Sequence, residues 1–311
     1  MNPLPFVVAV AFSTALLCGQ STWIVDNLGG PGTQFAQVQP AIQAAAPNDT
    51  ILVRFGVAYQ GFTINKPLRV VGLTGSGGYP PWSEQLVSIV GIPSGTNCEL
   101  SNFTVTRYPF IPGFGGLSAQ SNAGRIHVEG LGVFGAGQGV IEFIDCADVV
   151  VHDCQLSGMG QPVVVRHSTV RLGYCNVIPS IPFAVMGYPL SHTPAEALHV
   201  DNGTVILHNV FVQGANQAVT PYSWPQTSGL SAQNGTVICG PACVIRGGAY
   251  YAPGFPPNYG PGVTTFTGTL IRDPAAQVTS FVAATIQPTF RRIGVGTLPN
   301  VEWLMLDRLC G

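Results

Sequence analysis

Charged residues are scarce in this chain. They make up 8% of its 311 residues, and Lys66 is the only lysine, whereas ordinary domains carry roughly 25% charged residues. The net charge is −2, so the chain has no basic surface of the kind that binds nucleic acid, and we expect no nucleic-acid partner. Because apolar residues reach 46%, the low charge does not indicate disorder. It predicts a folded domain with a neutral, polar and aromatic surface.

The N-terminal apolar run, Phe6–Leu17, is too short to span a bilayer. It is followed by Gly19 and Ser21, small residues at the two positions that a signal peptidase reads. We therefore predict a signal peptide over residues 1–21, a secreted or cell-surface location, and a mature chain without a transmembrane segment. The run lacks a preceding Lys or Arg, and two alternatives stay open: a lipoprotein site at Cys18, or a buried N-terminal strand.

Repetition is the strongest pattern that the sequence contains. Five segments share apolar residues in the order V-x-V-x-x-V-x-V, and their first column reads Ile126, Val149, Val170, Val205 and Val237. In the last copy, Ala242 and Val244 fall in the third and fourth columns. Alternating apolar residues predict strands with one buried face. Pairs of short strands that recur every 21 to 35 residues predict a coil that stacks on itself.

A third strand precedes each pair, and a tight corner follows it. Asn202-Gly203-Thr204-Val205 recurs unchanged from Asn234 onward, and Gly-Leu-Ser-Ala-Gln occurs at 116–120 and at 229–233. Asn and Gly tolerate left-handed backbone angles, so we place them at the corner and align Cys146 and His167 with them on earlier coils. Three strands per coil predict a right-handed parallel β-helix. An antiparallel sandwich is the competitor, but it does not demand identical columns.

Residues 35–46 read as a short amphipathic helix with Phe35, Val38, Ile42 and Ala45 on one face. With the apolar segments that follow, this run resembles the opening coil of the pectin-lyase-like right-handed β-helix superfamily. The resemblance implies an all-β fold, a right-handed parallel β-helix solenoid with a short N-terminal capping helix. We divide the chain into the signal peptide (1–21), the β-helix (22–265) and C-terminal strands or a cap (266–311).

The catalytic signatures of that superfamily are missing. The pectate lyases have paired arginines around a proline and an acidic calcium cluster, and the polygalacturonases have Asn-Thr-Asp, Asp-Asp, Gly-His-Gly and Arg-Ile-Lys; none occurs here. We therefore expect no cofactor and no metal, and nothing in the sequence supports Ca²⁺. The single Cys-x3-Cys, Cys239 and Cys243, has no second pair or nearby His for zinc.

Eight cysteines leave an odd number after the predicted cleavage. Cys154 and Cys175 align on successive coils, and we favour small core residues over a disulfide there. Cys239 and Cys243 straddle Gly240-Pro241, and a bridge between them stays open.

Three long connections, 178–197, 215–229 and 248–263, are rich in Pro, Gly and aromatic residues. They fall at one corner of successive coils, where solenoids carry their binding faces. The candidate ligand-binding residues are Tyr188, Tyr222, Trp224, Tyr250 and Tyr251. Their rings either stack on sugars or pack on one another to hold the connections down.

A polar row on the first strand of each coil supplies candidate catalytic residues. The outward position before the corner reads Asp145, Arg166, Asp201 and Gln233, with His199 two residues before Asp201. One interpretation is a surface ion ladder. The other is an acid–base cluster of Arg166, His199 and Asp201, with His192 and Glu196 from the adjoining connection, for cleaving an acidic polysaccharide. Glu142 aligns inward, which we interpret as a slipped or bulged strand; a buried functional carboxylate is the minor alternative.

Together these observations predict an exported β-helix protein that binds or displays carbohydrate, with a polysaccharide or cell-surface glycan as its partner. A polysaccharide lyase or glycoside hydrolase is the alternative from a different class, so we leave open whether the protein is an enzyme. A structural or adhesive solenoid without a small ligand is the third possibility.

Overall fold

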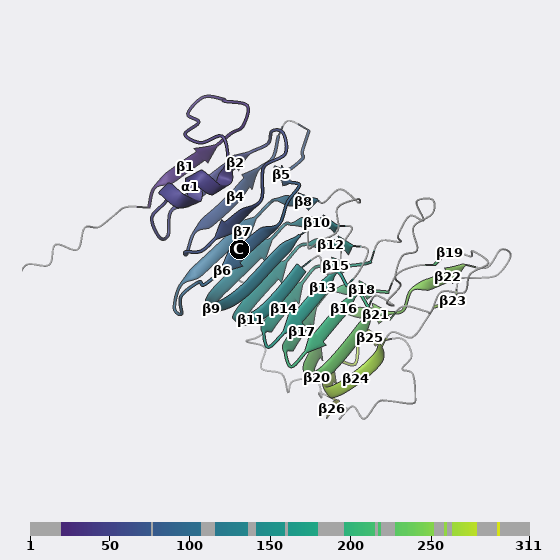
Figure 1. Cartoon of the computed structure of the whole chain (residues 1–311). Helices are drawn as coiled ribbons and strands as arrows, with labels where there is room; N and C mark the ends of the chain where they lie inside the picture. Colours follow the sequence, from purple (N-terminus) through teal and green to yellow (C-terminus); the bar gives the residue numbers. More distant parts are fainter. Residues whose placement is uncertain are drawn as a thin grey trace, which may run out of the picture.

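A computed structural model describes residues 20–75, 77–106, 116–135, 141–158, 161–179, 196–214, 217–218, 228–251, 258–259, 263–278 and 291–292. It shows an elongated stack of coils with a short helix against the strands at the N-terminal end (Figure 1). Each complete coil contributes one strand to each of three faces, which we call face 1, face 2 and face 3 in chain order.

Faces 1 and 2 form one continuous 15-stranded sheet. Face 1 contains β3 (Phe62–Ile64), β6 (Val87–Val90), β13 (Val163–Arg166) and β16 (Leu198–Asp201). Face 2 contains β1 (Thr22–Val25), β2 (Thr50–Arg54), β4 (Arg69–Leu73), β7 (Asn97–Ser101), β14 (Thr169–Gly173), β17 (Thr204–His208) and β26 (Arg291–Arg292). Four long strands turn the corner and belong to both faces: β9 (Leu117–Glu129), β11 (Ile141–His152), β20 (Leu230–Cys239) and β24 (Val263–Arg272).

Face 3 is an eight-stranded sheet of short strands. It contains β5 (Trp82–Ser83), β8 (Thr104–Thr106), β10 (Gly132–Gly135), β12 (Gln155–Gly158), β15 (Asn176–Val177), β18 (Phe211–Gln213), β21 (Val244–Arg246) and β25 (Gln277–Val278). Every pairing between coils in the two large sheets is parallel. The fold is the predicted right-handed parallel β-helix, and the antiparallel sandwich is excluded.

The predicted apolar columns form the core. Val149, Val170, Val205 and Val237 are partners in register on successive coils, and each is 0% exposed. A coil buries one face of every strand against its own other strands and against the coils above and below.

In the central coils, a residue with left-handed backbone angles lies at the corner between faces 1 and 2 and another at the corner between faces 2 and 3. At the corner between faces 1 and 2 these residues are Ser121, Asp145, His167, Asn202 and Asn234, with φ between 47° and 54°. The corner residue still donates its N–H to the next coil, as Asn202 does to the carbonyl of Gln233 at 2.9 Å. Space is tight at the glycine after Asn202, because a Cβ on Gly203 would lie 3.0 Å from the Ser168 carbonyl oxygen and the neighbouring backbone would have to shift.

Two alignments made from the sequence are one residue out. The residue equivalent to His167 is Asp145 and not Cys146. In the last copy, Cys243 and Ile245 are the fully buried residues, whereas Val244 pairs with the outward Phe211. Here Gly240-Pro241-Ala242 makes a corner one residue longer than in earlier coils, and Ala242 takes the left-handed angles.

The described cysteines are unpaired. Cys98, Cys146, Cys154, Cys175, Cys239 and Cys243 are all buried and carry free thiols. A Cys239–Cys243 bridge is therefore absent, and the prediction that Cys154 and Cys175 are small core residues is confirmed.

The predicted capping helix is α1 (Val38–Ala44), which packs on the first strands through Val38, Ala41 and Ile42. Phe35 lies before the helix, where it bridges Val25 and contacts the Trp23 ring. At the other end, β24 runs across residue 265 in parallel pairing with β20. No helix in the described part of the chain has the length and apolar character needed to cross a bilayer.

Parts of two long connections form a separate small sheet of β19 (Gln217–Ala218), β22 (Ala249–Tyr251) and β23 (Asn258–Tyr259). Figure 1 shows this sheet set apart from the coils on one side of the solenoid.

Candidate functional site

The outer side of face 1 carries two neighbouring rows of side chains across β11, β13, β16 and β20. One row, in register, reads Glu142, Val164, His199 and Ser231, and the other reads Ile144, Arg166, Asp201 and Gln233. Adjacent strands lie roughly 4.8 Å apart, so neighbours within a row are in side-chain reach. We call Glu142, Arg166, His199, Asp201 and Ser231 the face-1 site.

The predicted row contained one wrong residue. Asp145 lies at the corner, where its carboxylate is 3.4 Å from Nδ1 of His167. Between Ile144 and Val149, β11 has one residue more than the following coil has between Arg166 and Val170, so Ala147 has no counterpart on that coil. Against β9 the register also shifts, between Cys146 and Asp148, and there β9 carries the extra residue. This irregularity confirms the interpretation of Glu142, which faces outward in register with Ser118 and Val164.

The surroundings of Glu142 change the pKa of its carboxyl group. Burial raises the pKa of Glu142, and the positive charge of Arg166 partly opposes this shift. A carboxyl group with a raised pKa can hold its proton nearer to neutral pH and give it up to a bound molecule.

The expected ion ladder does not form on face 1. Although Arg166 and Asp201 are partners in register, no ion pair involving Arg166 occurs among the described residues. Asp201 instead accepts a hydrogen bond from Asn202 Nδ2 at 2.7 Å.

On face 2, by contrast, charged side chains of successive coils do form ion pairs. There Asp148 accepts from Arg125 Nε at 2.7 Å and also pairs with the guanidinium of Arg171. Two arginines on neighbouring coils thus satisfy one carboxylate. Among the residues that the structure describes, the Arg166 guanidinium has no such partner.

His199 has a fixed neighbour in the next coil. Its Nδ1 lies 2.8 Å from Oγ of Ser231. Ser231 belongs to the second Gly-Leu-Ser-Ala-Gln copy, and the equivalent hydroxyl in the first copy, Ser118, accepts from Gln120 Nε2 at 2.9 Å. The same pentapeptide on the same face therefore engages a histidine only in the second copy.

This part of face 1 is sheltered from solvent. Val164 points away from the core cluster yet is 1% exposed, and Ser231 is 3% exposed. Arg166, His199 and Asp201 are each partly exposed. Beside the site, Gln161 Nε2 donates to Glu196 at 2.8 Å, which links two coils just before β13 and β16.

The structure brings Arg166, His199 and Asp201 together on adjacent strands, as predicted. Tyr188, His192, Tyr222 and Trp224 lie outside the described residues. Tyr250 and Tyr251 lie on β22, in register with Gln217 and Ala218. Within the described ranges, no group of three His, Cys, Asp or Glu side chains is placed to hold a metal ion.

From the sequence, Ser231 could be placed outward beside His199 but was given no role, and a functional carboxylate at Glu142 was only the minor alternative. The duplicated pentapeptide marked the position of Ser231, but its contact with His199 depends on the register between coils. Glu142 stood out only as a charged residue in an apolar alignment.

No family model and no curated protein matches the chain. Three solved structures illustrate what the chain is similar to. Pectin methylesterase from Aspergillus niger has 12% identity, 88% coverage of this chain, 84% coverage of that chain and a TM-score of 0.42. A pectin methylesterase in complex with a hexasaccharide has 11% identity, coverage of 89% and 94%, and a TM-score of 0.42. Alginate lyase from Paenibacillus sp. str. FPU-7 has 12% identity, coverage of 82% and 94%, and a TM-score of 0.34. At these values the similarity carries no information on the face-1 site or its chemistry.

Proposed function

We propose that this chain is an exported β-helix protein that binds a glycan at the face-1 site. The observation that carries the proposal is the position of the Arg166 guanidinium. It lies beside the carboxylates of Glu142 and Asp201, but in the described part of the chain it forms no ion pair within 4.0 Å with either of them. A guanidinium offers five N–H donors in a rigid fork, and it is a strong donor for hydroxyl and carboxylate oxygens.

The neighbouring groups suit a ligand that both donates and accepts hydrogen bonds. His199, Ser231 and Asp201 can each take part in such bonds, and they lie on two adjacent coils. Sugar hydroxyls need both kinds of partner. The two carboxylates of the site, Glu142 and Asp201, oppose a polyanion such as nucleic acid.

The aromatic residues of the long connections add stacking surface in this proposal. Tyr188, Tyr222, Trp224, Tyr250 and Tyr251 are the proposed contacts, because a charge-poor strand face offers little apolar area to a sugar ring. Substituting Trp224→Ala should weaken glycan binding with little loss of stability.

A glycan-array screen followed by calorimetry tests the proposal. We expect Arg166→Gln to weaken binding about tenfold or more, since a hydrogen bond to a charged group contributes about 1.5–3 kcal/mol. Arg272→Gln is the matched control, because it removes the same charge from an exposed position on β24. A wild-type protein that binds no glycan on the array would defeat the proposal.

A second candidate, a polysaccharide lyase or glycoside hydrolase, is favoured by the raised pKa of Glu142 and by the His199–Ser231 contact. In a lyase a base such as His199 removes the proton beside a carboxylate, Arg166 holds the developing negative charge, and an acid such as Glu142 protonates the leaving oxygen. Ultraviolet absorbance of unsaturated products and a reducing-end assay detect the two reactions.

His199→Ala separates the two candidates. It should weaken glycan binding less than Arg166→Gln does, since one neutral hydrogen bond contributes about 0.5–1.5 kcal/mol, and it should abolish turnover if the protein is an enzyme. If the wild type binds glycan but releases no product, the binding function stands and the enzymatic one fails. If it neither binds glycan nor releases product, the protein is a structural or adhesive solenoid.

A further inference from the structure

The described exposed apolar side chains gather near the N-terminal coils. Five of the eight large ones lie between residues 28 and 79, namely Leu28, Phe55, Val57, Leu73 and Tyr79. Large exposed apolar side chains that lie together mark interaction sites more often than singly scattered ones do. No residue of the face-1 site belongs to this group.

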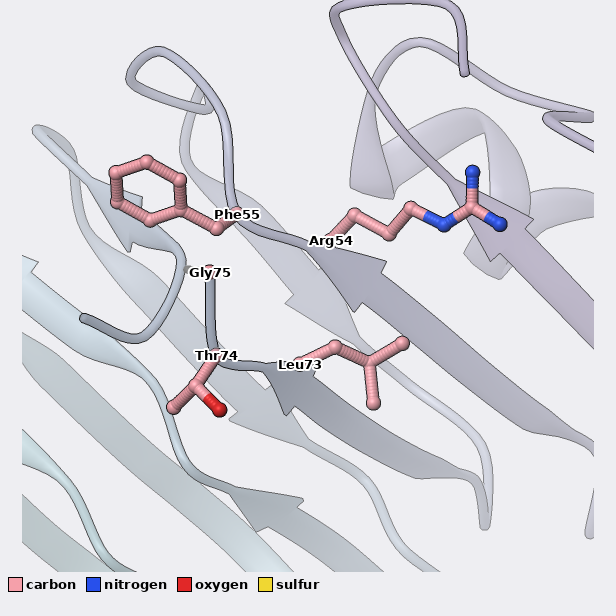
Figure 2. Close-up of a pocket in the computed structure, with 5 residues that line it drawn as sticks. All are labelled: Arg54, Phe55, Leu73, Thr74 and Gly75. Atoms are coloured by element: carbon pink, nitrogen blue, oxygen red, sulfur yellow. The ribbon is translucent and has the colours of Figure 1, made fainter. Parts of the chain in front are cut away.

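Two of these side chains line a pocket of about 400 Å³ at the ends of β2 and β4, together with Arg54, Thr74 and Gly75 (Figure 2). Pockets for small ligands typically measure roughly 300–1,000 Å³. Arg54 and Leu73 are partners in register, and Figure 2 shows their side chains extending in the same direction.

The Phe55 ring has a fixed place on the other side of the pocket. A Cβ added to Gly75 would lie 2.7 Å from two of its ring carbons, so the ring packs directly on the glycine backbone. Phe55 nevertheless remains 40% exposed. Gly75 N–H donates to the carbonyl of Tyr79 at 3.0 Å, and Tyr79 brings a second ring, 68% exposed, to the same loop.

The polar groups of the pocket are also held in position. Asp26 accepts from the backbone N–H groups of Leu28 and Gly30, at 2.8 and 3.0 Å, and its carboxylate lies 3.3 Å from Arg54 Nη1. The Leu28 N–H lowers the pKa of Asp26, burial opposes it, and Gly30 and Arg54 lower it further. The ionised carboxylate anchors one nitrogen of Arg54 and leaves its other N–H donors available. The Thr74 side chain is exposed at the pocket.

A flat exposed ring, an aliphatic side chain and a few fixed polar groups match the two sides of a pyranose. One side of such a ring carries C–H bonds and its rim carries hydroxyls. We propose that the pocket of Arg54, Phe55, Leu73, Thr74 and Gly75 is a second glycan site, which stacks one neutral pyranose ring on Phe55 and donates hydrogen bonds to its hydroxyls from Arg54. Tyr79 supports the adjoining sugar.

This site goes beyond the proposed function because it lies several coils from the face-1 site and shares no residue with it. Two glycan sites on one rigid solenoid allow one polymer chain to engage both. The second contact then occurs at a high effective concentration and strengthens binding without any new interaction.

Saturation-transfer difference NMR tests the proposal with neutral disaccharides of gluco, galacto and manno configuration as probes. We expect the wild type to transfer saturation to the protons of one pyranose face. Phe55→Ala should weaken binding about tenfold, the equivalent of about 1.4 kcal/mol, and Thr74→Val should weaken it less.

The matched control is Phe134→Ala, which removes an equally exposed ring (38%) from the outer side of β10. It should leave the signals unchanged. Arg166→Gln removes any contribution of the face-1 site, and the transfer that remains in this variant should be lost when Phe55→Ala is added, so the failure of one site is distinguishable from that of the other. Three results overturn the proposal: no transfer to any probe, unchanged signals in Phe55→Ala, or no remaining transfer in Arg166→Gln.

Discussion

Replacing Val205 by Asp should remove most of the stability of the coil around it. Val205 is 0% exposed and lies between Val170 and Val237, which are also 0% exposed. The lost apolar burial costs about 1.5–3 kcal/mol. A carboxylate has no partner in this column, so burial should raise its pKa by about 3 units or more. Protonating a group of pKa about 3.9 at pH 7 then costs about 1.36 × 3.1, or about 4 kcal/mol.

The sum, about 6 kcal/mol, is comparable with the whole stability of an ordinary domain, about 5–15 kcal/mol. Urea denaturation followed by circular dichroism measures it. The adjacent Thr204→Asp is the control, because Thr204 is partly exposed on the opposite side of the same strand. It introduces the same carboxylate with almost no change in side-chain volume. Gln213 is unsuitable as a control because it is 4% exposed and accepts a hydrogen bond from Arg246.

The pH dependence distinguishes burial of the charge from simple loss of packing. A folded-state pKa above the unfolded value means that the folded state binds more protons, so stability falls as pH rises between the two values. Lowering the pH from 7 to 5 should therefore raise the unfolding free energy of Val205→Asp by about 2.7 kcal/mol relative to that of the wild type. The unfolding free energy of Thr204→Asp should hardly change relative to the wild type. Equal denaturation midpoints for the two variants, at either pH, would refute the reasoning.

Two further predictions concern buried ionisable groups. Burial raises the pKa of Cys98 to about 12, so Cys98 should resist iodoacetamide at pH 8 in the folded protein and react once the chain is unfolded; rapid labelling of the native thiol, read by mass spectrometry, would contradict its burial. Burial would raise the pKa of Asp49, but hydrogen bonds from Trp23 Nε1 and from the backbone of Ser21 and Ala46 outweigh it and lower the pKa. Its contribution is therefore present above pH about 4 and lost as the pH falls through the lower folded value. Asp49→Asn should destabilise the protein by about 1–3 kcal/mol at pH 7 and less at pH 2, and a deficit that does not shrink on acidification would count against the ionised form.

The faces of the solenoid could be predicted from the sequence, whereas the number of residues at each corner could not. Alternation of apolar residues reports the phase of each strand, because side chains point to opposite faces in turn. It does not report how many residues a corner takes up. Ala147 and the long corner at Gly240-Pro241-Ala242 each displaced the alignment by one residue, which put Asp145 in the wrong row and Val244 in the core.

The candidate site could be predicted only as a set of strands. The placement of Arg166, His199 and Asp201 on neighbouring strands could be predicted, because the apolar columns of their two coils align correctly in the sequence. Whether two charged side chains on neighbouring strands meet depends on side-chain rotamers and local competitors, as the hydrogen bond from Asn202 to Asp201 shows. The pocket at Arg54 was not foreseen, since it joins the ends of two strands whose contact rests on the register between the first coils.

The left-handed corner residues close each coil into a turn that can be repeated along the solenoid. Ile141 pairs in register with Leu117 of the coil before it and with Val163 of the coil after it, so the first strand of this coil meets both neighbours in the same register. Residues 141–162 form one complete turn, and a tandem copy of them would meet matching partners on both sides. Each added copy would lengthen the molecule by about 4.8 Å. The distance between the N-terminal pocket and anything carried on later coils is thus set in steps by how many turns lie between them.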